Sequence, residues 1–360
     1  MTGAPGSPPK SSSPNDAGDG RPANSSRLDT HRFKKYALTA VRHESFVLVV
    51  ILALLMVAFN VISNRLFGRP ENLVNIIIQS STRSLAAVGQ ALVILTAGID
   101  LSVGGVAILA VTMGGALMTA TAGYLGPVPV GVGVLAMLLV GAGFGAINGL
   151  LVSRLRVPSL IVTLATWQMA LGIGSHLTAM GTGKPAVIIE LPPVLAILGQ
   201  RGPGGVPTPV VAFIAAIAIG YFILNHTTFG KSIYAVGDNE TAAYLSGVKT
   251  RNIKFWVYLI SGFCAAIAGL LQMGRVLAAS DKLVGSLELD SIAAVVVGGV
   301  SLFGGSGNLI GVLVGVLIIG VINNGMNIVG LNVWTQNLVK GSTIFAAVAV
   351  DAWRRSRRGG

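Results

Sequence analysis

The sequence has few charged residues and a single cysteine, and both shortages restrict what the chain can be. Only 11% of its 360 residues are charged, whereas 52% are hydrophobic. Soluble globular chains carry roughly a quarter charged residues. Cys264 lies in an apolar segment, so neither a disulfide framework nor a cysteine metal cluster is available. The composition therefore indicates a membrane protein in which Cys264 is a small packed hydrophobic side chain.

Motifs for catalysis and for nucleotide binding are also missing. The sequence has no HExxH, no GxSxG and no aspartate-rich metal-diphosphate repeat. A phosphate loop requires Gly, four residues, Gly, Lys and then Ser or Thr, and neither the glycines at 304–307 nor TAMGTGKP at 178–185 fits. The histidines stand apart and read as polar side chains, mostly near span ends: His31, His43, His176 and His226. We expect no enzyme activity, no cofactor and no metal site.

The formal net charge of +12 does not indicate nucleic acid as a partner. The basic residues are dispersed among apolar segments, and aromatic residues make up only 6% of the chain. A nucleic-acid surface would gather its cations on one face and interleave them with aromatic side chains. We instead expect the cations to mark one side of a membrane.

Long apolar runs and 48 glycines are what the sequence has in abundance. Small residues let membrane helices approach closely, and a spanning helix needs about twenty mostly apolar residues. We therefore predict an all-α polytopic membrane protein whose transmembrane domain covers 45–353. The ten predicted spans are 45–64, 73–97, 101–122, 128–152, 158–179, 208–225, 254–278, 289–302, 307–328 and 333–351. The eighth is too short to span alone, which indicates a broken or re-entrant element.

Basic clusters give the orientation of these spans. With ten crossings, all four clusters fall on one side, which the positive-inside rule identifies as cytoplasmic. The clusters are Arg32 to Arg42, Arg154 with Arg156, Lys231 to Lys254, and Arg354 to Arg358. The Gly- and Pro-rich loop 181–207 then lies outside. We predict a multi-pass inner-membrane protein with both termini in the cytoplasm.

The two ends of the chain are predicted to be tails. Residues 1–44 begin with a Pro-, Ser-, Gly- and Asn-rich stretch that has no apolar run, which is typical of disorder and not of a cleavable signal. Residues 354–360 form a short basic tail. Both are expected in the cytoplasm.

The outer loop divides the predicted spans into five and five. Equivalent halves would run in opposite directions, as inverted repeats in transporters do. AINGLLV near Asn148 and VINNGMNIV near Asn323 share a pattern, although Gly-rich helices resemble one another by composition alone. We hold a 5+5 inverted repeat as a hypothesis.

A polar stretch, VGDNETAAYLSGVK, interrupts the apolar sequence between the sixth and seventh predicted spans. Asp238 or Asn239 suits a helix N-cap, and Glu240 suits the positive end of the helix dipole. Gly247 suits the left-handed position that closes a helix. The stretch predicts a cytoplasmic helix of about two turns.

So short a helix is marginal on its own in water, so something must pack on it. The residues from Ala242 to Leu245 form a small face with one aromatic side chain. That face either docks into a groove of a partner or lies against the chain's own bundle. The residues alone leave both readings open.

Polar residues inside the spans are candidates for a translocation path. QSSTRS at 79–84 places Arg83 near the middle of the second span, where a charge needs a water-filled path, a partner acid or the bundle interior. We expect Gln79 and Ser80 to line a path and Arg83 to be paired. Asp290 and Lys340, both in or beside spans, are a candidate ion pair.

Asp100 follows a helix break at Gly98 and precedes Leu-Ser, so capping of the next helix explains it best. An acid so close to apolar segments also suggests a role in transport. The complete set of path candidates is Gln79, Ser80, Asp100, Asn323 and Asn324. The glycines of LDSIAAVVVGGVSLFGGSGNLIG indicate a tight turn between two close-packed half-helices.

Three stretches together resemble a known family. They are VILTAGIDLSVGG, NHTTFGKSIYAVGDNETAAYLSGVK and LDSIAAVVVGGVSLFGGSGNLIGVLVGVLIIGVINNGMN, in that order. They are similar to the permease subunits of bacterial monosaccharide ABC importers, the ribose, xylose and fructose group. The resemblance covers roughly Asn72 to Arg355. Arg83 departs from the family's usual pattern, so the resemblance gives this residue no role.

The resemblance implies partners and a role for the polar stretch. In that family two permease subunits, identical or different, form the pathway, a cytoplasmic ATPase drives it, and a periplasmic protein delivers the sugar. The loop at 226–253 would carry the coupling helix that sits in a cleft of the ATPase. The implied coupling residues are Gly237, Asp238, Asn239, Glu240, Ala243, Leu245 and Gly247.

An ion-coupled secondary transporter of a small polar solute is the alternative function. Such a transporter works without an ATPase and usually needs carboxylates inside its helix bundle. The candidates for that role are Asp100, Asp290 and Asp351.

Overall fold

The computed structural model describes residues 2–3, 46–181, 183–184, 186–200, 202 and 205–358. The chain divides into two compact units, Met1–His43 and Glu44–Gly360. The predicted disordered tail and the first basic cluster lie outside the described residues. The fold below is that of the second unit.

The described part of this unit is built from helices and short connections. The elements are a first helix Phe46–Ile62, α2 (Pro70–Leu95), α3 (Ser102–Met118), α4 (Val130–Ser153), α5 (Ser159–Ala179), η1 (Pro193–Leu195), α6 (Ala196–Gly199), α7 (Thr208–His226), α8 (Thr228–Asp238), α9 (Glu240–Leu245), α10 (Thr250–Val276), α11 (Leu287–Val297), α12 (Leu309–Ile328) and α13 (Val333–Arg358). Each predicted span overlaps one of these helices. The all-α fold class is confirmed.

Five of the described helices are long and apolar enough to cross a membrane, namely α4, α5, α7, α10 and α12. The first helix and α3 are apolar but shorter. Helix α2 has a polar centre, and α13 continues into its arginines and ends at Arg358. The number of ten crossings stays a prediction.

The eighth segment is short, as the sequence predicts, but its bounds differ from those expected. Helix α11 covers Leu287–Val297 instead of 289–302. It stops at Gly298, and Gly299 follows with a φ of +85°, in the left-handed region that favours glycine. The glycine pair therefore ends the helix before the residues that an apolar count includes.

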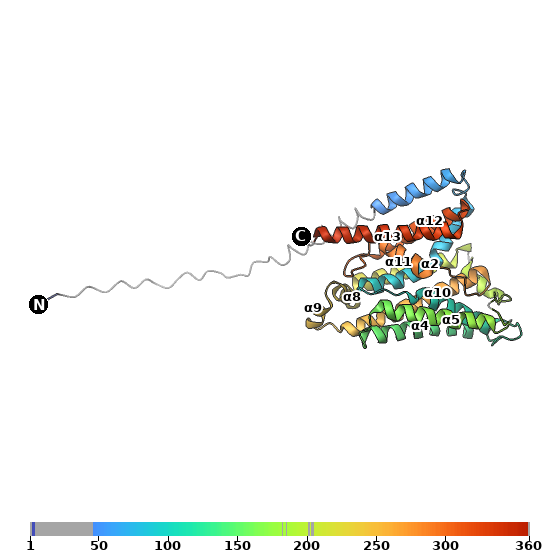
Figure 1. Cartoon of the computed structure of the whole chain (residues 1–360), viewed down its shortest axis with the longest axis horizontal. Helices are drawn as coiled ribbons and strands as arrows, with labels where there is room; N and C mark the ends of the chain where they lie inside the picture. Colours follow the sequence, from blue (N-terminus) through green and yellow to red (C-terminus); the bar gives the residue numbers. More distant parts are fainter. Residues whose placement is uncertain are drawn as a thin grey trace. The chain divides into compact units, whose positions relative to one another are not determined.

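Helix α2 is the centre of the bundle. It packs against α7, α8, α10, α11 and α12, and most of its residues from Ser80 onward are buried. Figure 1 shows α4 and α5 on one side of the bundle and α13 on the other, with α2, α10 and α11 between them. The polar centre of α2 therefore faces protein, as a charged segment in a membrane requires.

Glycine allows a close contact between α4 and α10. A Cβ atom added at Gly141 would lie 2.4 Å from the carbonyl oxygen of Gly262, and one at Gly145 would lie 2.6 Å from that of Tyr258. Either added atom would overlap backbone. These positions explain part of the high glycine content by helix packing.

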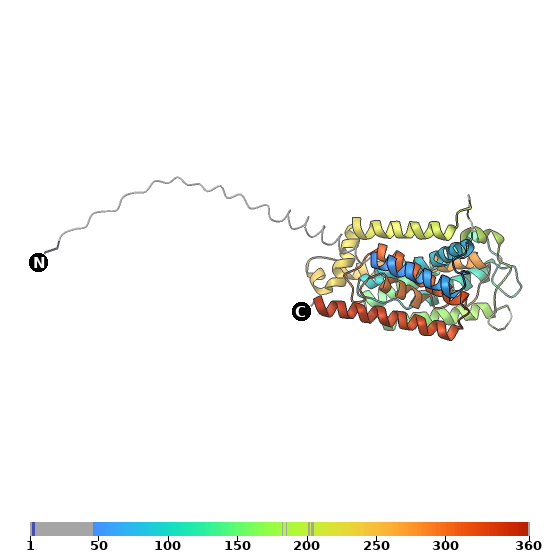
Figure 2. The same ribbon diagram turned by 90° about the horizontal axis from the view of Figure 1, so that it is seen from above.

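The two ends of the bundle differ. Figures 1 and 2 show α9 and the last turn of α13 at the same end. The loop after α4 is also there, because Arg156 lines one cavity together with Glu240 and Arg251. At the opposite end, Gly199 of α6 packs on Arg275 near the end of α10. The basic clusters that the structure describes thus share one end, as predicted.

Candidate functional site

The polar stretch forms the end of α8 and the short helix α9. Asn239 is the N-cap of α9, and its Oδ1 accepts a hydrogen bond from the Ala242 amide at 2.9 Å. Asp238 is the last residue of α8, so of the two predicted caps only Asn239 acts as one. Gly247 has a φ of +88°, the left-handed conformation predicted for it. The helix has 6 residues, close to the two turns expected.

Helix α9 has one packed side and one free side. Ala243 is buried within the main hydrophobic cluster. Tyr244 is 67% exposed and Leu245 is 79% exposed. Glu240 pairs with Lys254 on α10, which ties the start of α9 to the bundle. Helix α9 therefore packs against the chain's own bundle on one side, and its other side is open for a partner.

The base of this element touches two distant parts of the chain through backbone. A Cβ atom at Gly237 would lie 1.8 Å from the carbonyl oxygen of Leu95, at the end of α2. The same carbonyl accepts a hydrogen bond from the Gly305 amide at 3.0 Å. Gly304 and Gly305 have φ values of +83° and +71° and form the turn before α12. The three stretches that carry the family resemblance therefore meet at one point.

Side chains hold the glycine turn from both flanks. The Tyr234 hydroxyl on α8 donates to the Gly307 carbonyl at 3.0 Å, and burial raises the pKa of this phenol, which keeps it a donor. On the other flank, Asp351 of α13 accepts from the Ser301 hydroxyl at 3.0 Å and from the Leu302 amide at 3.1 Å. The turn is thus fixed to α8 and to α13.

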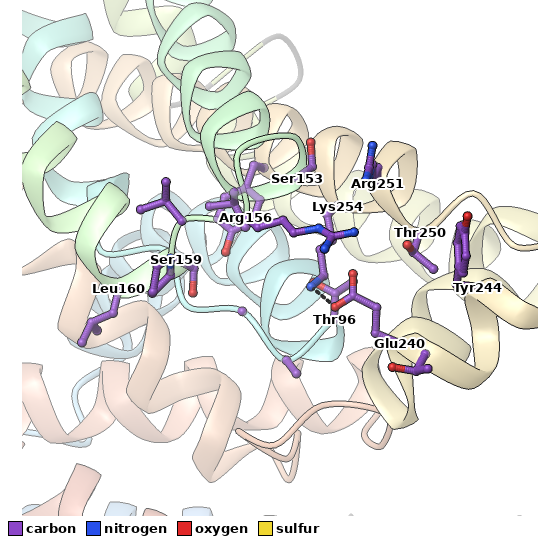
Figure 3. Close-up of a pocket in the computed structure, with 17 residues that line it drawn as sticks. Thr96, Ser153, Arg156, Ser159, Leu160, Glu240, Tyr244, Thr250, Arg251 and Lys254 are labelled. Atoms are coloured by element: carbon purple, nitrogen blue, oxygen red, sulfur yellow. Dashed lines mark hydrogen bonds and ion pairs between the residues drawn. The ribbon is translucent and has the colours of Figure 1, made fainter.

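A cavity of about 700 Å³ opens beside α9. Figure 3 shows it between the loop after α4, the end of α2 and the start of α10, with Arg156 pointing into it. Its charged lining residues are Arg156, Glu240, Arg251 and Lys254. The cavity makes one wall of α9 accessible at this end of the bundle.

Asp100 is fully buried and is satisfied by protein. Its Oδ1 accepts from the amide of Ser102, the first residue of α3, at 3.0 Å, although Leu101 and not Asp100 occupies the N-cap position. Its Oδ2 accepts from the Ser261 hydroxyl at 2.8 Å. The Asn148 amide donates to the Ser102 hydroxyl at 2.8 Å, so this network connects α3, α4 and α10.

A second polar cluster lies halfway along α2. Asp290 at the start of α11 accepts from Lys340 Nζ of α13 at 2.9 Å and from Arg83 Nη1 of α2 at 3.3 Å. The Asn323 amide of α12 donates to the same carboxylate at 3.0 Å. The candidate pair of Asp290 and Lys340 and the expected pairing of Arg83 are both confirmed.

The path candidates fall into separate places. Ser80 and Asn323 line one small cavity together with Arg83 and Asp290. Gln79 is half-buried on α2 next to Ser80. Asn324 donates instead to Asn72 Oδ1 at 3.0 Å, and Asp100 belongs to the network described above. The structure brings together only part of the predicted set.

The apolar spanning helices, the buried ionic cluster and the capped polar element at one end are the features of a polytopic membrane protein. The sequence matches over residues 72–348 the family described as the permease component of branched-chain amino acid transport systems. The chain belongs to this family. It is a permease component, a multi-pass inner-membrane protein and a transport subunit, not an enzyme.

Curated relatives match along most of their length. The ribose import permease protein RbsC of Escherichia coli K12 is 38% identical over 322 residues, which cover 88% of this chain and 96% of the relative. The fructose import permease protein FrcC of Rhizobium meliloti is 36% identical and covers 85% of each chain. The galactose/methyl galactoside import permease protein MglC of E. coli K12 is 36% identical, covering 90% of this chain and 98% of the relative. No solved structure matches the chain.

Proposed function

We propose that this chain is the membrane subunit of an ABC importer that passes a monosaccharide of the ribose, xylose or fructose type into the cell. A separate ATPase drives the transport, a periplasmic protein delivers the sugar, and a second permease subunit completes the pathway. Relatives named for the import of ribose, fructose and galactose support a sugar as the cargo. The α9 end of the bundle, with both termini, faces the cytoplasm, because the basic clusters gather there.

The proposal rests mainly on helix α9, which has an exposed tip and a base that is attached to the bundle. Tyr244 and Leu245 offer an unpartnered apolar surface among the described residues, of the kind that fills a groove in another protein. Asn239, Glu240, Ala243 and Gly247 set the shape and attachment of α9. We assign the ATPase contact to this tip.

The end of α8, just before α9, connects the proposed ATPase contact to the membrane helices. At Gly237 and Asp238 the end of α8 lies in direct backbone contact with α2 and with the glycine turn. Backbone contacts without intervening side chains transmit small displacements because packed interfaces deform little. A push on α9 would therefore shift the ends of α2 and α12 together.

We place Ser80 and Asn323 on the sugar path, with Gln79 beside them on α2. Asp100 and Asn324 then hold the helices around that path, since each is hydrogen-bonded to a neighbouring helix or segment. Ser80 Oγ and Asn323 Oδ1 have no hydrogen-bond partner among the described residues and line the same cavity. Asn324 Oδ1 also has no such partner, but Asn324 does not line that cavity.

Ion coupling is the weaker alternative, because the three candidate carboxylates already bind protein groups. Asp100 accepts from Ser102 and Ser261, and Asp351 accepts from the glycine turn. Asp290 has two cations and an amide as partners. An acid that binds and releases a coupling ion needs ligand positions that protein groups do not occupy, whereas each of these carboxylates already has two or more protein partners.

The coupling role is tested by replacing Leu245 with Asp in cells that express the chain with its ATPase and binding protein. A charge on the exposed tip should reduce ATP-dependent sugar uptake at least tenfold, because it cannot be buried in an apolar groove. Membrane insertion and capture of sugar by the binding protein should stay normal. Tyr244→Phe, which keeps the ring, is the matched control, and unchanged uptake in Leu245→Asp would contradict the assignment.

A further inference from the structure

A small cavity lies at the polar centre of α2, where the helix meets α11 and α12. Its volume is about 10 Å³. Its polar lining comes from three helices: Ser80 and Arg83 on α2, Asp290 and Ser291 on α11, and Asn323 on α12. Gly320 completes the wall beside Ser80. These side chains converge halfway along α2, inside the membrane, where burying a polar or charged group costs the most free energy.

Two of the lining side chains have hydrogen-bonding atoms without a partner among the described residues. Ser80 is 2% exposed and its Oγ is unpaired. Asn323 is 5% exposed and its Oδ1 is unpaired, although its amide nitrogen binds Asp290. A buried unpaired polar group costs about 1–3 kcal/mol, so a protein retains two at one place for a reason.

The groups in this cavity match one ligand chemistry. Ser80, Asn323 Oδ1 and Asp290 accept hydrogen bonds, whereas the Arg83 guanidinium donates through a planar fork of N–H groups. A sugar hydroxyl both donates and accepts, so neighbouring hydroxyls use both kinds of group. An anion placed here would face the Asp290 carboxylate at close range, which disfavours it.

We propose that Ser80, Arg83, Asp290 and Asn323 form a binding site for a neutral polyhydroxylated sugar inside the membrane, and that the structure shows this site closed. The proposal rests on the proposed function and adds the residues that recognise the cargo. Ser80 and Asn323 bind hydroxyls directly, and Asp290 accepts from a hydroxyl in place of Arg83.

The closed state follows from the volume. About 10 Å³ is near the lower limit for a single water molecule, so no sugar fits. The weaker link across the cavity is the contact of Arg83 with Asp290, at 3.3 Å and with Arg83 35% exposed. Lys340 binds the other oxygen at 2.9 Å and is 19% exposed. Separation of α11 from α2 would break the Arg83 contact first and leave Asp290 charge-paired with Lys340.

Helix α11 links the opening of the sugar site to α9 at the cytoplasmic end of the bundle. Helix α11 leads through Gly298 and Gly299 into the turn at Gly304 and Gly305, which touches Gly237 and Asp238. A displacement of α9 thus reaches the far end of the same helix that presents Asp290. Asp290 lies near the start of α11, and the glycine turn that contacts the base of α9 follows the other end of this helix.

Two neighbouring serines provide the test. Ser80→Ala removes the unpaired hydroxyl from the cavity. Ser81→Ala removes an equally buried hydroxyl that donates to the Ile77 carbonyl at 2.7 Å and does not line the cavity. The complex of each variant with its ATPase, without the binding protein, is placed in nanodiscs and incubated with ¹⁴C-labelled D-ribose, D-fructose or D-galactose at millimolar concentration.

Loss of one hydrogen bond to a neutral group should reduce sugar binding by Ser80→Ala about fivefold. Because an unpaired group has been removed, the thermal midpoint of Ser80→Ala should stay the same or rise. Ser81→Ala should bind within twofold of the unsubstituted complex.

Three results would overturn the site. They are equal binding by Ser80→Ala, a fall in its thermal midpoint that accompanies the loss of binding, and absence of sugar binding by an unsubstituted complex that still transports sugar. Absence of ATP-dependent uptake of these three sugars and of D-xylose by the unsubstituted importer would overturn the proposed function itself. Binding of D-galacturonate in preference to D-galactose would replace the neutral ligand with an acidic one.

Discussion

Single residues decide whether the base of α9 can lie against α2. Gly237 has no room for a side chain, since an added Cβ atom would overlap the Leu95 carbonyl. Gly305 meets the same carbonyl with its amide, at a positive φ that favours glycine. The proposed coupling contact thus depends on two glycines more than 60 residues apart in the sequence.

Gly237→Ala should separate α8 from the end of α2 and destabilise the protein by about 1–3 kcal/mol, the usual cost of overpacking. Uptake should fall more than the protein level, because the coupling contact is lost. Thermal unfolding of the purified chain and sugar uptake in cells measure the two effects. Gly143→Ala is the control, since a Cβ atom there meets nothing within 4 Å. Equal behaviour of the two variants would refute the close contact.

The two cations of Asp290 should differ in their importance for stability. Lys340 is the more buried and the closer partner. Lys340→Met should therefore cost roughly 3 kcal/mol or more, because it leaves a buried carboxylate with only a half-exposed arginine. Arg83→Gln should cost about 1 kcal/mol or less, as partly exposed pairs do. Denaturation in detergent ranks the two variants, and the reverse order would show that Arg83 is the main counter-ion.

At the scale of elements, the glycine turn between α11 and α12 contacts three separate helices. It touches α2 through Leu95, α8 through Tyr234 and α13 through Asp351. None of these partners is close to it in the sequence. The turn therefore depends on the assembled bundle for its conformation.

Asp351→Ala should loosen the turn. It leaves the Leu302 amide and the Ser301 hydroxyl without their acceptor, at a cost of about 1–3 kcal/mol. Hydrogen exchange at Leu302 to Gly305 should become at least tenfold faster, while exchange in α4 stays unchanged. Asp351→Asn keeps an acceptor oxygen and should show a smaller effect. Unchanged exchange at the turn in Asp351→Ala would mean that α13 does not hold it.

The sequence predicts the elements better than it predicts their contacts. Apolar runs locate helices such as α4 and α7, and local chemistry identifies the cap at Asn239 and the closing conformation at Gly247. These features depend on residues that are close in the sequence.

The contacts that glycines and polar residues make with distant parts of the chain could not be predicted from the sequence. Gly237 and Asn148 look ordinary, because their roles appear only when Leu95 and Ser102 come into contact with them. For Arg83 the membrane environment indicates that a partner is needed, but not which one. The end of α11 was misplaced because an apolar count does not register the conformation at Gly299.

For the whole molecule, the account requires that the α9 end face the cytoplasm and the loop after α5 face outward. Cysteines at 187 and 245, in a chain whose Cys264 is replaced by alanine, report on the two ends, because Val187 and Leu245 are both exposed. A membrane-impermeant thiol reagent added to intact cells should label Val187→Cys at once. Leu245→Cys should be labelled only after the membrane is permeabilised. Labelling of position 245 from outside would invert the topology.

The central claim is that the tip of α9 is received by an ATPase that this chain does not contain. A photo-crosslinking amino acid at position 245, in cells that express the importer, tests it most directly. The account predicts one crosslinked product that contains this chain and the ATPase, and its loss when Gly237 is replaced by alanine. A product that joins position 245 only to the chain's own helices, with no ATPase attached, would contradict the account.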